Sequence, residues 1–166
     1  MKLYYFTTSE YKSKNANFIN TDCMSKEFSS LLDESYSFFY NYEKETVIKE
    51  KKQTIFSLKA SKGKLGLSLF YLKSFLKVFS KLQNEDIIFT RSKQIILLAA
   101  IFFKGTSCIE MHGGIVSLFD KFLFFFLSKF KKIKFVVISN AIRVELLKFV
   151  KKEKVLLARD AHNFEI

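Results

Sequence analysis

Short apolar runs alternate with amphipathic stretches along the whole chain. Seven runs have the composition of β-strands and predict strands at residues 3–7, 36–42, 53–60, 86–90, 107–111, 134–139 and 154–158. Apolar positions with helical spacing predict helices at residues 21–32, 65–82, 93–104, 116–132 and 141–151. Residues 8–20 are polar and are expected to form a loop, and the charged residues 43–52 an exposed loop or a short helix.

In two of the predicted helices, the distribution of apolar and basic residues indicates how the helix should pack. Residues 65–82 carry an apolar stripe on one face (Leu72, Phe75, Leu76, Phe79 and Leu82) and a basic stripe on another (Lys73, Lys77 and Lys81). The next helix, at residues 93–104, is apolar nearly all round, which predicts a buried position. Ser92 is placed to cap its first turn.

The regular alternation of strands and helices predicts an α/β fold. Strand–helix–strand units cross over in a right-handed sense, so we expect a three-layer α/β/α domain with a mainly parallel sheet of about seven strands. Ligands bind at the carboxyl ends of the strands in such sheets. The polar residues that follow strands are therefore the candidate site residues, namely those near Asn17 and Asn20, Arg91, residues 112–114, and Ser139 with Asn140.

The sequence Glu-Met-His-Gly-Gly at residues 110–114 holds one of two histidines and two of five glycines. Gly113 and Gly114 would allow a positive φ or the close approach of a ligand. If the next helix began near Gly114 or Ile115, its amides could face an anion. Alternatively, His112 is only a hydrogen-bonded residue at the rim. Glu110 should point to the same side of the strand as His112, and we favour a structural role for it, bonded to neighbouring backbone.

Arg91 stands out because lysine supplies nearly all of the positive charge. Arginine occurs at only three positions, Arg91, Arg143 and Arg159. Its planar guanidinium group is hard for lysine to replace, so a carboxylate or phosphate partner is expected for Arg91. A salt bridge to a neighbouring loop is the alternative.

A formal net charge of +12 makes polyanions candidate partners. The chain lacks zinc-finger spacing, an RNP-like signature and basic-region heptads, so no nucleic-acid partner is expected. Neither histidine lies in a metal-binding spacing, and no metal site is expected. Cys23 and Cys108 form no CxxC pair and are interpreted as reduced, buried thiols of a cytoplasmic protein.

Phenylalanine and lysine are concentrated in residues 119–135, FDKFLFFFLSKFKKIKF. The phenylalanines either pack between the sheet and a neighbouring helix or dip into a lipid leaflet while the lysines meet anionic headgroups. No apolar run reaches the length that spans a bilayer. One functional hypothesis is therefore a basic, non-enzymatic module that binds the inner face of the cell membrane peripherally.

Several enzyme classes lack their sequence signatures here. There is no GxGxxG after the first strand, no GxxxxGK[ST] and no GxSxG. Classical dinucleotide binding, P-loop phosphate binding and the α/β-hydrolase elbow are disfavoured.

Five segments in order resemble the N-terminal domain of GT-B glycosyltransferases of family 4: NANFIN at 15–20, DIIFTRS at 86–92, CIEMHGG at 108–114, FVVISNA at 135–141 and KVLLARDAHNFEI at 154–166. The resemblance implies a Rossmann-like acceptor-binding domain over residues 1–158, with residues 159–166 beginning the crossover to a C-terminal donor domain. The first segment lacks the double glycine of many relatives, and the last has Ala161, His162 and Asn163 where Gly, Val and Asp are usual.

The family's enzymes transfer a sugar from a nucleotide diphosphate sugar to a lipid-linked or glycan acceptor, which implies a role in cell-surface polysaccharide or glycolipid synthesis. By this resemblance His112 is a catalytic residue that faces the interdomain cleft and hydrogen-bonds the sugar or acceptor. The implied acceptor-binding residues are Arg91, Gly113, Gly114, Ser139, Asn17 and Asn20. The donor is expected only with a C-terminal domain or a separate donor-domain chain, so this chain alone should bind no cofactor and be inactive.

Overall fold

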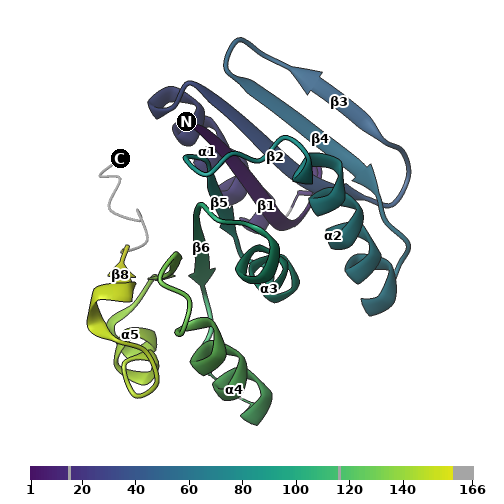
Figure 1. Cartoon of the computed structure of the whole chain (residues 1–166). Helices are drawn as coiled ribbons and strands as arrows, with labels where there is room; N and C mark the ends of the chain where they lie inside the picture. Colours follow the sequence, from purple (N-terminus) through teal and green to yellow (C-terminus); the bar gives the residue numbers. More distant parts are fainter. Residues whose placement is uncertain (15, 116, 159–166) are drawn as a thin grey trace, which may run out of the picture.

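An eight-stranded sheet forms the centre of the computed structural model, which describes residues 1–14, 16–115 and 117–158. The strand order is β3-β4-β2-β1-β5-β6-β7-β8, and every neighbouring pair is parallel except β3 with β4 (Figure 1). The strands are β1 Lys2–Glu10, β2 Glu34–Asn41, β3 Thr46–Lys49, β4 Gln53–Lys59, β5 Ile87–Thr90, β6 Thr106–Met111, β7 Ile133–Val137 and β8 Val155–Leu157. The predicted α/β class with a mainly parallel sheet is confirmed, with one strand more than expected.

Helices cover both faces of this sheet. They are α1 Ala16–Leu31, α2 Lys64–Phe79, α3 Lys93–Phe102, α4 Leu118–Leu127 and α5 Asn140–Leu146, with the 3-10 turn η1 Lys152–Lys154. Alternate side chains of β1 face opposite layers: Tyr4 and Phe6 pack with residues of α2 and α3, whereas Leu3 and Tyr5 pack with residues of α1. Residues of α4 and α5 pack on β6, β7 and β8. The domain therefore has the three predicted layers.

Aromatic side chains account for much of the core. Phe38 on β2 is fully buried and stacks between Phe6 on β1 and Phe56 on β4, with ring centroids 4.7 Å and 4.9 Å apart. The three rings form a ladder across neighbouring strands, where side chains on one face lie close enough to interact. Many of the 21 phenylalanines are thus structural.

The boundaries predicted near the N-terminus are wrong. Residues 8–20 are not one loop, because β1 continues to Glu10 and α1 begins at Ala16. The inward face of α1 includes two buried polar residues, Thr21 and Ser25. They are satisfied by hydrogen bonds to the Asn17 carbonyl and the Ser37 hydroxyl. The polar residues 16–20 favour a loop in the sequence analysis, so the predicted helix begins only at Thr21. Cys23, which we expected to be buried, is exposed on α1.

The prediction for residues 43–52 is also wrong. This charged stretch contains β3, whose four residues Thr-Val-Ile-Lys pair antiparallel with β4 at the edge of the sheet. Thr, Val and Ile favour strands, but the flanking Glu and Lys residues masked this short run.

Helices α2, α3 and α4 also differ from expectation. The buried positions of α2 include Phe70, Tyr71, Phe75 and Val78, whereas Leu72, Leu76 and Phe79 of the predicted apolar stripe are exposed. Ser92 caps α3 as predicted, accepting a hydrogen bond from the amide of Ile95. The C-terminal residues Ile101 and Phe102 of α3 are exposed, so that helix is buried on one side only. Ser117 caps α4, so α4 begins at Leu118, two residues later than predicted.

Candidate functional site

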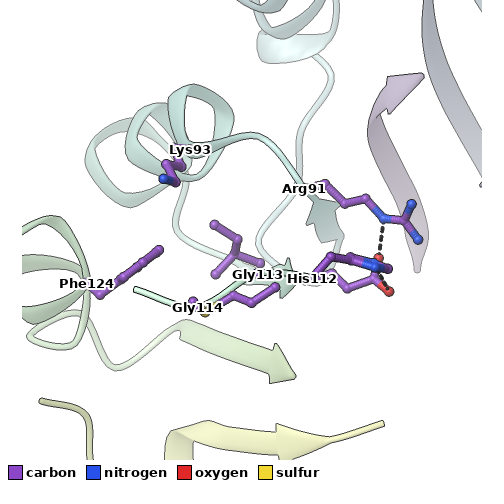
Figure 2. Close-up of a pocket in the computed structure, with 9 residues that line it drawn as sticks. Arg91, Lys93, His112, Gly113, Gly114 and Phe124 are labelled. Atoms are coloured by element: carbon purple, nitrogen blue, oxygen red, sulfur yellow. Dashed lines mark hydrogen bonds and ion pairs between the residues drawn. The ribbon is translucent and has the colours of Figure 1, made fainter. Parts of the chain in front are cut away.

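A pocket lies at the carboxyl ends of two neighbouring strands, β5 and β6. Its volume is about 200 Å³. Arg91 directly follows β5, and residues 112–114 directly follow β6 (Figure 2). The lining residues are Arg91, Lys93, Ile109, Glu110, Met111, His112, Gly113, Gly114 and Phe124. Four residues singled out from the sequence, Arg91, His112, Gly113 and Gly114, are therefore brought together.

Arg91 and Glu110 form a buried ion pair in the lining of this pocket. The Nε of Arg91 donates to Oε2 of Glu110 at 2.6 Å, and the two side chains are only 7% and 6% exposed. Register explains the contact, because Thr90 of β5 pairs with Ile109 of β6 and the next residues on the two strands are Arg91 and Glu110. The expected carboxylate partner of Arg91 is thus an internal one, on a neighbouring strand rather than a loop.

His112 shares this carboxylate. Its Nε2 lies 2.9 Å from Oε1 of Glu110, and its side chain is 38% exposed, so the ring lies at the mouth of the pocket. The prediction that Glu110 and His112 face the same side of the chain is confirmed. The expected backbone role of Glu110 is wrong, because side chains hold it. Burial raises the pKa of Glu110, but hydrogen bonds from His112 and Arg91 outweigh burial and bring its pKa below the ordinary value.

Arg91 also connects the pocket to helix α1. Its Nη1 donates to Oδ1 of Asn17 at 2.9 Å and approaches Oγ1 of Thr21 at 3.4 Å. Its Nη2 lies 3.3 Å from Sδ of Met24. Asn17, predicted as a binding residue, therefore reaches the site through Arg91. Thr21 and Met24 were missed, because the predicted start of the helix gave no reason to place them at the carboxyl edge.

The segment of Gly113 and Gly114 differs from the expectation in its backbone conformation and in what occupies the predicted anion position. Gly63 is the one glycine with positive φ among the described residues, so residues 113 and 114 do not need glycine for left-handed backbone. The amide of Ile115 donates to Oε2 of Glu145 on α5 at 3.0 Å, so an internal carboxylate occupies the predicted anion position. A Cβ at Gly113 would meet nothing within 4 Å, whereas one at Gly114 would lie 2.9 Å from Glu145. Gly113 thus leaves open space at the pocket mouth.

The remaining predicted site residues lie elsewhere. Ser139 caps α5, accepting from the amide of Ile142 at 3.3 Å, and Asn20 is exposed on α1; neither lines the pocket. Lys93 and Phe124 line it although the sequence analysis did not select them. Lys93, which follows the Ser92 cap, could have been found from its position, and its Nζ pairs with Asp120 of α4. Nothing in the sequence around Phe124 indicates that it lines a pocket.

Within residues 1–14, 16–115 and 117–158, no three His, Cys, Asp or Glu side chains are grouped to hold a metal ion. The polar groups that line the pocket are the carboxylate, imidazole, guanidinium and ammonium groups already described. Such a set can bind and orient a hydroxyl-rich ligand by hydrogen bonds.

We expect the stability of the domain to report the ionisation of Glu110. Because its folded-state pKa is lowered, its contribution is complete above the ordinary value of 4.5 and is lost as the pH falls through the folded-state pKa. Glu110→Gln should lower the free energy of unfolding at neutral pH, and its difference from the parent chain should narrow below pH 4.5. Urea unfolding of both chains, from neutral pH to below pH 4.5, measures the two free energies of unfolding and their difference.

The control for that experiment is Glu85→Gln, at an exposed glutamate without an ion pair to any residue that the structure describes. Its difference from the parent chain should stay small at every pH. A constant difference for Glu110→Gln down to the acid limit would contradict the ionised, paired carboxylate.

No family model and no curated protein matches this chain. Solved structures do. An alpha,alpha-trehalose-phosphate synthase (UDP-forming) from Burkholderia vietnamiensis aligns with a TM-score of 0.59 at 10% identity, over 92% of this chain and 43% of that chain. The synthase from Burkholderia xenovorans in complex with glucose-6-phosphate aligns with a TM-score of 0.59 at 10% identity, over 88% of this chain and 42% of that chain.

A third similar structure, the Escherichia coli protein described as bound with UDP-2-fluoro glucose, aligns with a TM-score of 0.56 at 11% identity, over 89% of this chain and 42% of that chain. At such identities the likeness shows the fold: the chain adopts the Rossmann-like half of a GT-B fold. It spans less than half the length of these structures.

Proposed function

We propose that this chain is the acceptor-binding half of a family-4-like glycosyltransferase. The reaction would transfer a sugar from a nucleotide diphosphate sugar to a lipid-linked or glycan acceptor, in the synthesis of cell-surface polysaccharide or glycolipid. The observation that carries the proposal is the His112–Glu110–Arg91 arrangement at the carboxyl edge of a GT-B-type sheet. Several similar structures are named trehalose-phosphate synthases (UDP-forming), and one such synthase is described in terms of enzymatic glycosyltransfer, which supports the class of reaction.

The size and chemistry of the pocket suit a sugar. About 200 Å³ is below the range of roughly 300–1,000 Å³ that encloses drug-sized ligands, so the pocket fits one sugar ring rather than a whole nucleotide sugar. Both oxygens of Glu110 face Arg91 and His112, and with the Nε2 of His112 directed at Glu110, the Nδ1 of the exposed imidazole is left to accept a hydrogen bond from a sugar hydroxyl.

Each polar group has a separate role in this proposal. His112 touches the ligand at the pocket mouth and hydrogen-bonds the transferred sugar or the acceptor. Glu110 fixes the orientation of the imidazole through its 2.9 Å contact, and Arg91 keeps Glu110 ionised and in place. A donor nucleotide would be held by a second Rossmann-like half, on the same or a separate chain, as the lengths of the similar structures suggest.

Binding to this pocket can be tested on the purified chain by ¹H–¹⁵N NMR. Titration with glucose 6-phosphate and with soluble oligosaccharides should shift the amide signals of Arg91 and of residues 110–114. Gly113→Ala should weaken binding by about tenfold, because its methyl group would occupy the pocket mouth, at a change in unfolding free energy within about 0.5 kcal/mol. Labelled nucleotide sugar added to the same sample should yield no transfer product.

The control is a small substitution away from the pocket. Ser68→Ala removes a hydroxyl group that donates to the Lys64 carbonyl within α2, and it should leave sugar binding unchanged. Shifts confined to other parts of the sheet, or equal affinities of the Gly113→Ala and parent chains, would count against an acceptor site here. Transfer product would count against the expected inactivity of the chain alone.

A further inference from the structure

Helix α4 is apolar on two opposite sides. Leu123, Phe124 and Leu127 are buried in the core. The outward side is apolar as well, with exposed fractions from 37% to 82%, and comprises Leu118, Phe119, Phe122, Phe125 and Phe126. A surface helix normally presents polar side chains to water. We call these five residues the outer face of α4.

Lysines, and no acids, accompany this outer face. Lys121 and Lys129 are exposed on or next to the helix, and Nζ of Lys129 lies 4.2 Å from the ring centroid of Phe125. The one acidic residue of α4, Asp120, is turned inward and pairs with Lys93. The outer face is therefore both apolar and cationic.

Helices α2 and α3 belong to the same layer as α4 (Figure 1). Exposed apolar residues also occur on the outside of α2 and at the end of α3, where Phe79 and Phe102 are in ring contact. The sequences of α2 and α3 contain no acidic residue, and Lys73 and Lys77 are exposed on α2, where Lys73 pairs with Glu45 of a neighbouring loop. One helical layer thus combines exposed aromatic and aliphatic side chains with an excess of lysine over acidic residues.

We propose that the outer face of α4 docks onto an anionic lipid bilayer. Phenylalanine and leucine on one side of a helix, bordered by lysine, suit a helix that lies in the membrane interface. The lysines complement anionic headgroups, whereas the buried centre of a protein interface is depleted of charge. Among the described residues, no helix is long and apolar enough to cross a membrane, so the docked helix lies on the surface.

This inference does not depend on the proposed function, because it concerns a surface outside the His112 site. The two are nevertheless close along the chain. Ser117, which caps α4, follows Gly114 by three positions, and Phe124 of α4 lines the pocket. A docked α4 therefore brings the pocket mouth near the lipid surface.

Tryptophan fluorescence gives a direct test, because the chain contains no tryptophan. In the chain with Phe122→Trp, the emission should shift to shorter wavelength when vesicles of phosphatidylcholine and phosphatidylglycerol are added. The matched control is Leu31→Trp, at a residue that is 78% exposed on α1 in the opposite layer, and its emission should not move. Equal shifts for both variants, or no shift for Phe122→Trp, would overturn the proposal.

Co-sedimentation separates the apolar and charged contributions. Phe119→Ser with Phe122→Ser should reduce binding to these vesicles on the order of tenfold or more. Lys121→Gln with Lys129→Gln should reduce it by roughly tenfold, with little effect on vesicles of phosphatidylcholine alone. Circular dichroism should show all variants folded, because the four side chains are exposed.

The other occupants of this face give different results. If the face pairs two copies of this chain, size-exclusion chromatography will show a dimer that the double serine variant dissociates, without vesicle binding. If it binds another protein, the purified chain will stay monomeric and will not sediment with vesicles. Either result, or binding that does not depend on phosphatidylglycerol, would overturn docking to an anionic bilayer.

Discussion

Replacing Arg91 with alanine is expected to lower the free energy of unfolding by about 3–5 kcal/mol. The substitution removes the main cation from a carboxylate that is only 6% exposed, and His112 at the pocket mouth replaces it incompletely. It also breaks the 2.9 Å contact with Asn17, which holds the start of α1 against the carboxyl edge. Urea unfolding followed by circular dichroism measures the loss.

Two comparisons make this result specific. Lys73→Ala breaks the ion pair with Glu45, whose two side chains are 54% and 42% exposed, so the loss should stay below about 1 kcal/mol. Arg91→Met combined with Glu110→Leu removes both charges and should recover most of the stability. If Arg91→Ala cost no more than Lys73→Ala, the buried ion pair would not exist in solution.

Phe38→Ala is expected to have an equally large effect, a loss of about 3–5 kcal/mol. Phe38 is fully buried and stacks on Phe6 and Phe56, so alanine would leave a cavity between three strands. The loss of two ring contacts adds to the lost burial. Thermal or urea unfolding gives the difference.

The same substitution on the surface is the control. Phe119→Ala removes a ring that is 67% exposed and should change stability by no more than about 0.5 kcal/mol. A similar loss for both variants would mean that the aromatic ladder does not carry the core. A small loss for both would mean that the core around β2 relaxes to fill the space.

Most of the strands could be predicted from the sequence because they are buried on both faces and are therefore continuous apolar runs. Residues 134–139 are the clearest example. The site followed from the same regularity, since Arg91 and His112 stand directly after adjacent parallel strands. Their shared partner Glu110 follows from the register of β5 and β6, once the strand order is known.

Other features depend on contacts that no local pattern contains. The start of α1 was missed because residues 16–20 belong to a polar stretch without helical periodicity, and the apolar Ile19 within it is exposed. The contact of Glu145 with the amide of Ile115 joins residues thirty positions apart. For α4 the pattern was apolar on two sides and could not show which side faces the sheet.

Strand β3 has a consequence for the behaviour of the chain in solution. It lies at one end of the sheet, is four residues long, and ends at Lys49, with the exposed Lys51 and Lys52 soon after. At the other end of the described sheet, β8 has three residues. Long apolar edges recruit strands from other molecules, and short edges with lysine resist this. The charged stretch that resembled a loop therefore protects a phenylalanine-rich sheet against edge-to-edge aggregation.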